Sequence, residues 1–346
     1  MKTFHYFVLL LLAMTVSAEA RTWTAKTGHT INGEFVKLEG ETVLIQLPDG
    51  KLAKIKLDLL LDENQQFVQN ATKKKDDDSP FIIDDASPTP AKETMEKSRK
   101  AGERMTLKIS DVEYAFRWCP AGTFKMGSPD DEKYPDDKKH RNKNEVQHQV
   151  TLSRGFWMLE TEVTQEMWTS IMEKNPSKNE GVKRPVEYVS WDNCQEYIKK
   201  LNDLGVAPAG FEFSLPTEAQ WEYACRAGTT TTYASGNSLN QNLACFLEKQ
   251  TREVGSYRAN AWGFRDMHGN IEEWCLDVFG EYSSDAVTDP TDPVVVTYET
   301  ARVCRGGEFY NYGWNCRSAA RNWRARSSPS AYLGLRLALV HAKEKP

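Results

Sequence analysis

The sequence lacks an apolar stretch long enough to cross a membrane. Its longest apolar run, at residues 7–16, is well short of the ~20 residues that a helix needs to span a bilayer. A large charge excess is missing as well, because 44 Lys and Arg oppose 49 Asp and Glu and leave a net charge of −5. Both signs are spread along the chain, so the sequence disfavours nucleic acid and an anionic membrane surface as partners.

Closely spaced cysteines are also absent. The nearest pair, Cys304 and Cys316, is twelve residues apart, so the paired spacing of a zinc-binding knuckle does not occur. The odd number of cysteines leaves at least one thiol unpaired even in an oxidising compartment, and their spacing fixes no disulfide pairing. All of them lie in the C-terminal part of the chain: Cys119, Cys194, Cys225, Cys245, Cys275, Cys304 and Cys316.

Residues 1–20 have the pattern of a secretory signal peptide. Lys2 precedes the apolar run, and Ala18-Glu19-Ala20 has the small-x-small form that signal peptidase accepts. The alternative, a retained membrane anchor, is disfavoured because the run is too short. We therefore predict export to the periplasm or the cell exterior, with cleavage after Ala20 and a mature chain that begins at Arg21.

Residues 21–70 are predicted to form a small β unit. Strand patterns occur at 31–38, 42–47 and 51–57. Asp58 is placed to cap a helix over 59–68. A further set of residues carries a family likeness: Arg21-Thr22-Trp23-Thr24, Gly33-Glu34-Phe35, Asp49-Gly50-Lys51, Leu60 and Phe67-Val68. They resemble the Sla-type homology domain, an SH3-like barrel, so the unit is expected to be an interaction module.

Residues 71–105 are predicted to be a solvated linker between two domains. A block of three lysines at 73–75 is followed directly by three aspartates at 76–78, and Ser87-Pro88-Thr89-Pro90 comes next. Such blocked charge and X-Pro pairs cannot bury enough apolar surface to offset the entropy of ordering the chain. A binding tail is the alternative interpretation of the charge block.

Residues 106–342 have the composition of a larger domain organised around aromatic side chains. Eight of the ten tryptophans lie between Trp118 and Trp314, among many glycines and turn residues. Long regular elements are scarce in this region. Short helices are expected at 165–172, 191–201 and 218–226.

A long series of short motifs runs through this region. In chain order they include Phe116-Arg117-Trp118-Cys119-Pro120-Ala121-Gly122-Thr123-Phe124-Lys125-Met126-Gly127-Ser128, Glu162-Val163-Thr164, Arg184-Pro185-Val186, Leu215-Pro216-Thr217-Glu218-Ala219-Gln220-Trp221-Glu222-Tyr223-Ala224, Asp266-Met267-His268-Gly269-Asn270, Glu273-Trp274, Arg305-Gly306-Gly307, Arg317-Ser318-Ala319-Ala320-Arg321 and Gly334-Leu335-Arg336. Their identity and order resemble the formylglycine-generating enzyme, or sulfatase-modifying factor, family. The resemblance implies an α+β domain of C-type-lectin-like topology with little regular structure. Most of its Trp and Gly residues are expected to hold loops and packed turns rather than to contact a substrate.

Asn270 and Glu273 are the candidate metal ligands. The matching Gly-Asn-x-x-Glu-Trp stretch binds structural calcium in the family that this region resembles. An amide oxygen, a carboxylate and the intervening carbonyls are the ligands that a hard cation prefers. In the alternative interpretation, Asn270 caps the next segment and Glu273 pairs with an arginine. The neighbouring His268 is interpreted as a hydrogen-bonded loop residue, because the sequence places no Ser or Cys partner near it.

The copper site of the resembled enzymes is incomplete in this sequence. Those enzymes oxidise a cysteine of an unfolded sulfatase segment, using oxygen and a copper(I) ion that two thiolates hold after an Arg-Gly-Gly-Ser-Trp motif. Here Glu308 replaces the serine, which would place a carboxylate in the oxygen pocket, and Asn311 stands where the first cysteine would be. Cys316, the only thiol in the loop, is expected to be a buried thiol or half of a disulfide. It is the candidate catalytic residue only if the protein is an active oxidase. Cys304 is expected to point into the core.

Several functions stay open at the level of sequence. One is a formylglycine-generating oxidase that acts on a sulfatase, and another is a different reaction on the same fold, because fold does not determine function. A third is a non-catalytic binding or scaffold protein for a protein, a peptide or a glycan. Its binding surface would consist of Trp314, Arg317, Arg321 and Trp323. The missing cysteine pair favours this third function, with structural calcium and without copper.

Overall fold

The computed structural model describes residues 21–24, 30–39, 42–47, 52–60, 64–65, 68, 99–132, 144–291, 295–296 and 301–342. The chain divides into two compact units, Met1–Ser87 and Pro88–Pro346, each with its own core. The predicted signal peptide at 1–20 lies outside the described residues, as does 71–98 of the predicted linker. Within the described residues, no helix is long and apolar enough to pass through a bilayer.

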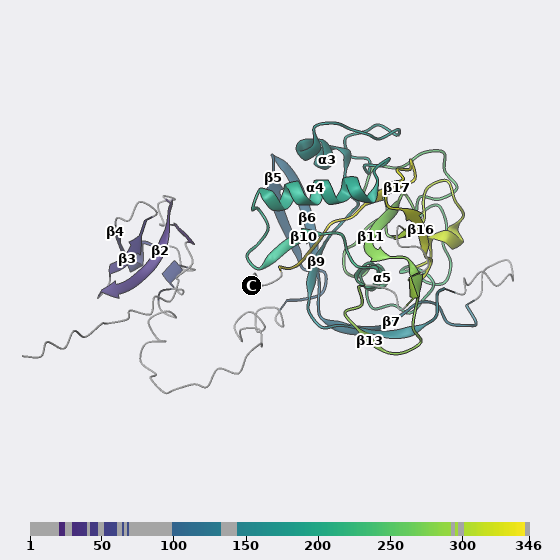
Figure 1. Ribbon diagram of the computed structural model, residues 1–346, viewed down its shortest axis with the longest axis horizontal. Coiled ribbons are helices and arrows are strands. Elements are labelled where there is room, and N and C mark those ends of the chain that lie inside the picture. Colours follow the sequence, from purple (N-terminus) through teal and green to yellow (C-terminus); the bar gives the residue numbers. More distant parts are fainter. Residues whose placement is uncertain are drawn as a thin grey trace, which may run out of the picture. The chain divides into compact units, whose positions relative to one another are not determined.

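The N-terminal unit contains an antiparallel sheet that includes the three predicted strands and one further strand at its start (Figure 1). The sheet order is β1 (Arg21–Thr24), β2 (Thr30–Glu39), β3 (Thr42–Gln46) and β4 (Leu52–Lys56). The core of the unit consists of Trp23, Val43, Ile45, Leu60 and Val68. The predicted helix start is wrong. Asp58 lies inside a 3₁₀ turn at Leu57–Leu59, and Leu60 is extended because its side chain enters this core.

A long antiparallel sheet forms one side of the C-terminal unit (Figure 1). Its order is β10 (Phe211–Ser214), β18 (Ala338–His341), β9 (Phe156–Leu159), β6 (Val112–Cys119) and β5 (Arg104–Ile109). In β6, Tyr114, Phe116 and Trp118 are buried, because successive side chains of a strand point to opposite faces. These side chains form the centre of the larger core cluster.

The predicted helices of this unit are confirmed. They are α3 (Gln165–Met172), α4 (Trp191–Asp203) and α5 (Glu218–Arg226). Each begins where a hydroxyl accepts a hydrogen bond from the backbone three residues ahead, at Thr164, Ser190 and Thr217. The helix α4 continues two residues beyond the predicted end at 201. Both α3 and α4 pack against the long sheet (Figure 1).

A second sheet carries the residues of the candidate site. Its order is β16 (Asn322–Ala325), β15 (Ala301–Arg305), β11 (Glu272–Val278) and β17 (Leu333–Leu335). The strands β11 and β17 are parallel, and the other neighbours are antiparallel. Smaller sheets pair β13 (Val287–Thr288) with β8 (His148–Leu152) and β7 (Gly122–Met126), and β12 (Gly280–Glu281) with β14 (Val295–Val296). The described fold is therefore mostly β, with few helices.

Buried indoles and glycines hold the packed turns of this unit. The largest fully buried side chains include Trp118, Trp157, Trp221 and Trp274. Gly307 follows β15 with a φ of 71°, and a Cβ there would lie 2.7 Å from both the Asn315 carbonyl oxygen and the Cys316 sulfur. Only glycine lets the turn after β15 approach that segment so closely.

Candidate functional site

A cavity of about 270 Å³ lies beside the turn that follows β15. Strands β11, β15 and β16 contribute lining residues, and so does the segment that contains the 3₁₀ helix η2 (Gly313–Cys316). We call this cavity the polar pocket. It is lined by Glu272, Cys304, Arg305, Gly306, Gly307, Asn311, Trp314, Asn315, Arg317, Ala320, Arg321 and Asn322. The Arg-Gly-Gly motif at 305–307 is part of its wall.

Glu272 on β11 is the acidic group of the polar pocket. One carboxylate oxygen accepts a hydrogen bond of 2.5 Å from the Asn322 amide, and the other lies 3.3 Å from the Arg324 guanidinium. Burial raises the pKa of Glu272, while Arg324 and Asn322 oppose that shift. The carboxylate is therefore held in a fixed position, and a partly exposed arginine compensates its charge.

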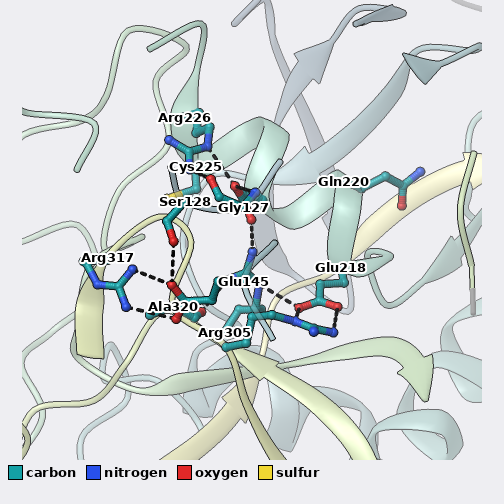
Figure 2. A network of polar contacts seen from close by, with 12 residues as sticks. Gly127, Ser128, Glu145, Glu218, Gln220, Cys225, Arg226, Arg305, Arg317 and Ala320 are labelled. Atoms are coloured by element: carbon teal, nitrogen blue, oxygen red, sulfur yellow. Dashed lines mark hydrogen bonds and ion pairs between the residues drawn. The ribbon is translucent and has the colours of Figure 1, made fainter. Parts of the chain in front are cut away.

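Buried arginines and glutamates form a network behind the polar pocket (Figure 2). Arg305 bonds to Glu222 and lies 3.3 Å from Glu218. Arg321 donates two hydrogen bonds of 2.7 Å to Glu218. Burial alone would raise the pKa of Glu218, yet Arg321 and Arg305 together hold it below its ordinary value. The glutamate is thus ionised, and the network fixes the loops that line the pocket.

Arg317 is bound in the same manner on the other side of the network. It donates hydrogen bonds of 2.8 and 2.9 Å to Glu145, which also accepts one from Ser128, as Figure 2 shows. We call the whole set the arginine network: Arg305, Arg317, Arg321, Glu145, Glu218 and Glu222.

The members of the predicted binding surface differ in exposure. Trp314, Arg317 and Arg321 line the polar pocket, but Arg317 is 2% exposed and Arg321 is 6% exposed, and both guanidiniums are paired with carboxylates. A buried guanidinium needs a carboxylate to offset its desolvation, and those carboxylates lie in the interior. Trp323 is 40% exposed, and Trp314 is partly buried beneath Tyr312, onto which it stacks. The two tryptophans are therefore the members of the predicted set that reach the surface.

The thiols nearest the polar pocket do not form a pair. Cys304 borders the pocket and packs in the larger core cluster, as predicted. Cys316 packs in a separate cluster with Tyr233 and Phe246 and does not line the pocket. All seven cysteines are free and buried, which settles the open choice for Cys316 in favour of a buried thiol. Burial raises the pKa of the Cys304 and Cys316 thiols, so both are protonated.

Glu308 does not enter the polar pocket, contrary to expectation. Its carboxylate accepts a hydrogen bond of 2.6 Å from the Tyr310 backbone and is not among the lining groups. The turn at 308–311 leaves backbone N–H groups that need an acceptor, and this side chain supplies one. The substitution of glutamate for the family's serine therefore closes a turn.

His268 is a neutral structural residue. Its Nδ1 donates a hydrogen bond of 2.8 Å to the Cys316 carbonyl, and its Nε2 accepts one of 3.0 Å from the Ala234 backbone. Burial lowers the pKa of His268 to about 4. The Cys225 sulfur lies 3.8 Å from Nε2, but burial raises the pKa of that thiol to about 12. The pair is therefore no nucleophile and base, and His268 ties two loops together.

Glu273 pairs with an arginine, as the alternative interpretation of the predicted metal site states. Its carboxylate accepts hydrogen bonds of 2.6 to 3.1 Å from Arg336 and one of 2.6 Å from the Trp221 indole. Asn270 has other partners. Its amide nitrogen donates to Glu162 at 2.9 Å, and its amide oxygen accepts from the Arg252 backbone at 2.8 Å. Glu273 is thus engaged by Arg336 and Trp221, and Asn270 by Glu162 and Arg252.

Two acids that the sequence analysis assigned no role lie beside Asn270. Glu162 is fully buried and Asp266 is 9% exposed, and each has a carboxylate oxygen without a hydrogen-bond partner among the described residues. Burial raises the pKa of Asp266 to about 6, and burial together with Asp266 raises that of Glu162. We call Glu162, Asp266 and Asn270 the acidic cluster. Both acids stand in quoted motifs, but sequence spacing gave no sign that they would meet.

Known proteins resemble the chain over its C-terminal unit. A sequence profile described as the sulfatase-modifying factor enzyme 1-like domain matches residues 112–340. The formylglycine-generating enzyme of Streptomyces coelicolor is 33% identical over 176 residues, which cover 44% of this chain and 52% of that enzyme. The serine/threonine-protein kinase pkn1 of Chlamydia caviae is 34% identical over 154 residues, which cover 43% of this chain and 22% of the kinase.

The fold has a counterpart among solved structures. Treponema denticola variable protein 1 is 26% identical and superposes with a TM-score of 0.59, covering 68% of this chain and 98% of that one. The sequence matches are shorter. The chain spans about half the length of the Streptomyces enzyme and about a fifth of the chlamydial kinase.

Proposed function

Because the chain belongs to the sulfatase-modifying factor family, we propose that its C-terminal unit is a binding or scaffold member that does not make formylglycine. The separation of the two thiols nearest the polar pocket carries this proposal. Cys304 borders the pocket, whereas Cys316 packs in another cluster. Copper(I) is a soft ion that the family's enzymes hold with two thiolates, and a single thiol cannot replace that pair.

The burial of the thiols supports the same conclusion. Cys304 and Cys316 are both fully buried, so neither sulfur is open to copper(I) from solution. In this proposal the polar pocket receives a partner instead of copper and oxygen. The candidate partners are a protein or peptide, a sulfatase among them, or a glycan.

The proposal is tested with the family's own reaction. Mature protein is incubated with copper(I), oxygen and a Cys-x-Pro-x-Arg peptide, and mass spectrometry follows conversion of the peptide cysteine to the aldehyde. We expect no conversion, and a chelator competition should reveal no tightly bound copper(I). The Streptomyces coelicolor enzyme in the same buffer is the positive control.

The matched variants are Cys304→Ser and Cys316→Ser. Both are expected to leave the copper and peptide results unchanged, because neither thiol is assigned a role in chemistry. Turnover by the unmodified protein that either substitution removes would contradict the proposal. It would restore the alternative function, a formylglycine-generating oxidase.

Structural calcium is retained as a proposal with a changed set of ligands. Glu273 is replaced by Glu162 and Asp266, since these two acids have unbonded buried oxygens. Asn270 stays in the set, but its amide must turn over to act as a ligand, because it now directs its nitrogen at Glu162 and its oxygen at the Arg252 backbone. Carboxylate and amide oxygens suit a hard cation, and its charge would offset that of the two acids. The residues of the acidic cluster therefore fit a calcium ion better than the predicted pair does.

Export and an interaction role for the N-terminal unit complete the proposal. The small-x-small sequence that ends at Ala20 supports export to the periplasm or exterior. The antiparallel order of β1 to β4 is compatible with an SH3-like, Sla-type module. Mass spectrometry of the exported chain should give Arg21 as its first residue, and a chain that starts at Met1 would contradict cleavage.

A further inference from the structure

Exposed tyrosines lie next to residues of the polar pocket. We call Tyr310, Tyr312 and Tyr332 the aromatic collar. Tyr310 and Tyr312 flank the pocket residue Asn311. The carbonyl of Tyr332 accepts a hydrogen bond of 2.8 Å from the backbone of Glu272, the acid of the pocket. Each collar residue is therefore directly next to a residue that lines the pocket.

The collar rings are held against neighbouring rings. Tyr312 stacks on Trp314 with a centroid distance of 4.2 Å and an interplanar angle of 7°. The ring centroids of Tyr332 and Tyr310 lie 6.2 Å apart. Rings that are fixed before binding lose little conformational entropy when a ligand covers them, and exposed indole and phenol rings are common anchors at binding sites.

The polar pocket presents hydrogen-bonding groups with balanced charge. Its arginines already bond to carboxylates of the arginine network, so they leave little attraction for a phosphate or sulfate. Glu272 is compensated by Arg324, so a cationic ligand gains little there either. The amides of Asn311 and Asn315 add donors and acceptors at the wall. These features favour an uncharged ligand with many hydroxyl or amide groups.

Size distinguishes among uncharged ligands. The cavity of about 270 Å³ is at the small end of ligand pockets, which span roughly 300–1,000 Å³. It therefore has room for one ring, and further units of a longer ligand would lie across the collar. A peptide side chain with apolar surface would find few apolar groups in this wall, which consists mainly of charged and amide residues.

We infer that the polar pocket and the aromatic collar bind an uncharged saccharide. A pyranose ring has a face of C–H groups that stacks on the negative face of an aromatic ring. Its hydroxyl groups can donate to Glu272 and exchange hydrogen bonds with Asn311 and Asn315. One sugar ring enters the pocket and its neighbours cover the collar. This inference rests on the proposed binding function and names the class of its ligand.

The test measures retention of the full mature chain on immobilised neutral oligosaccharides of glucose, mannose, galactose, xylose and N-acetylglucosamine. Sulfated heparin and the Cys-x-Pro-x-Arg peptide are run beside them. We expect retention on at least one neutral sugar, with a Kd that changes less than about twofold between low and high salt, because no net charge is exchanged.

Variants assign that binding to the pocket and the collar. Glu272→Gln should weaken it about tenfold or more, since a hydrogen bond to a charged group is lost. Tyr312→Ala should weaken it about tenfold through loss of the stacking surface. Glu196→Gln and Leu204→Ala, exposed positions in and directly after α4, are the matched controls and should bind normally. Circular dichroism checks that each variant is folded.

The possible outcomes separate this inference from the proposed function. If the folded protein is retained on no neutral sugar, the saccharide inference is overturned. The same holds if Glu272→Gln and Tyr312→Ala both bind sugar as well as the unmodified protein. Peptide retention that Glu272→Gln removes overturns the saccharide inference and leaves the binding function in place. Conversion of the peptide to the aldehyde overturns the binding function itself.

Discussion

Two buried charged regions of the C-terminal unit differ in how their charges are balanced. In the arginine network, each guanidinium bonds to at least one carboxylate. In the acidic cluster, Glu162 and Asp266 lie together with no arginine directly bonded, and each keeps an oxygen without a partner among the described residues. In the first region Arg321 and Arg305 lower the pKa of Glu218, although burial raises that of Glu145 to about 8. In the second region burial raises the pKa of Asp266 to about 6.

This difference separates a region whose charged groups are bonded in pairs from a region whose acids have no bonded arginine. A network with matched charges costs little beyond desolvation, and it positions the loops around the polar pocket. Glu162 and Asp266 share the nearby Arg336 with Glu273, to which that arginine is bonded, so burial of these acids favours uptake of a proton or a cation. The same unit therefore contains one region of directly paired charges and one in which the acids lack a bonded arginine.

The largest expected effect comes from unbalancing the arginine network. Glu222→Gln removes the carboxylate that both Arg305 and Arg226 contact. Arg226 then has no paired carboxylate among the described residues, and Arg305 retains only Glu218, which it shares with Arg321. We expect the free energy of unfolding to fall by about 3–5 kcal/mol, as when one partner of a buried ion pair is removed. Urea unfolding followed by tryptophan fluorescence measures the change. A loss below about 1 kcal/mol would mean that the network does not hold the unit together.

A somewhat smaller effect should come from calcium at the acidic cluster. Protein stripped with a chelator should gain about 2.7 kcal/mol in unfolding free energy when calcium is added at a hundred times its Kd. Glu162→Gln should abolish the gain and should stabilise the calcium-free protein, because it removes a buried charge. The exposed Glu196→Gln variant should keep the full gain. A calcium response that survives Glu162→Gln would move the site elsewhere.

The buried side chain of His268 tests the effect of burial on charge through the pH dependence of the free energy of unfolding. The pKa of His268 is about 4 in the folded protein, below the ordinary value of 6.5, so between these values the unfolded chain binds more protons. Its contribution to stability is complete above pH 6.5 and decreases as the pH falls toward 4, by on the order of 2 kcal/mol. Unfolding curves across this range should show the decrease. His268→Asn, which cannot titrate there, should flatten it, and an equally steep curve in that variant would refute the assignment.

The smallest effect is expected where charges are exposed. Lys199 and Asp203 are paired at 2.5 Å on the surface of α4, with both side chains more than half exposed. Because water screens such a pair, Lys199→Gln should change the free energy of unfolding by less than about 0.5 kcal/mol. The same urea experiment provides the measurement. A loss comparable to that of Glu222→Gln would show that burial is not what distinguishes the arginine network.

The helices of the C-terminal unit could be predicted from the sequence because their signals are local. A hydroxyl at Thr164, Ser190 or Thr217 followed by apolar residues at helical spacing is enough to place a helix. The N-terminal strands were predicted from their β-rich runs for the same reason. The local signal at Asp58 was misleading. Burial of the Leu60 side chain in the core outweighed the tendency of Asp58 to cap a helix.

The sequence by itself also determined that the thiol pair is absent, since a missing cysteine needs no structure to be noticed. Only the tertiary structure decided where the charged side chains point. Arg317 meets Glu145, 172 residues away in sequence, and Asn270 meets Glu162, 108 residues away. The Glu308 carboxylate bonds to the backbone N–H of Tyr310, and the Glu273 carboxylate bonds to Arg336. Charged side chains are long and can reach several partners, and the partner that offsets the cost of burial is set by which distant segments the folded core brings together.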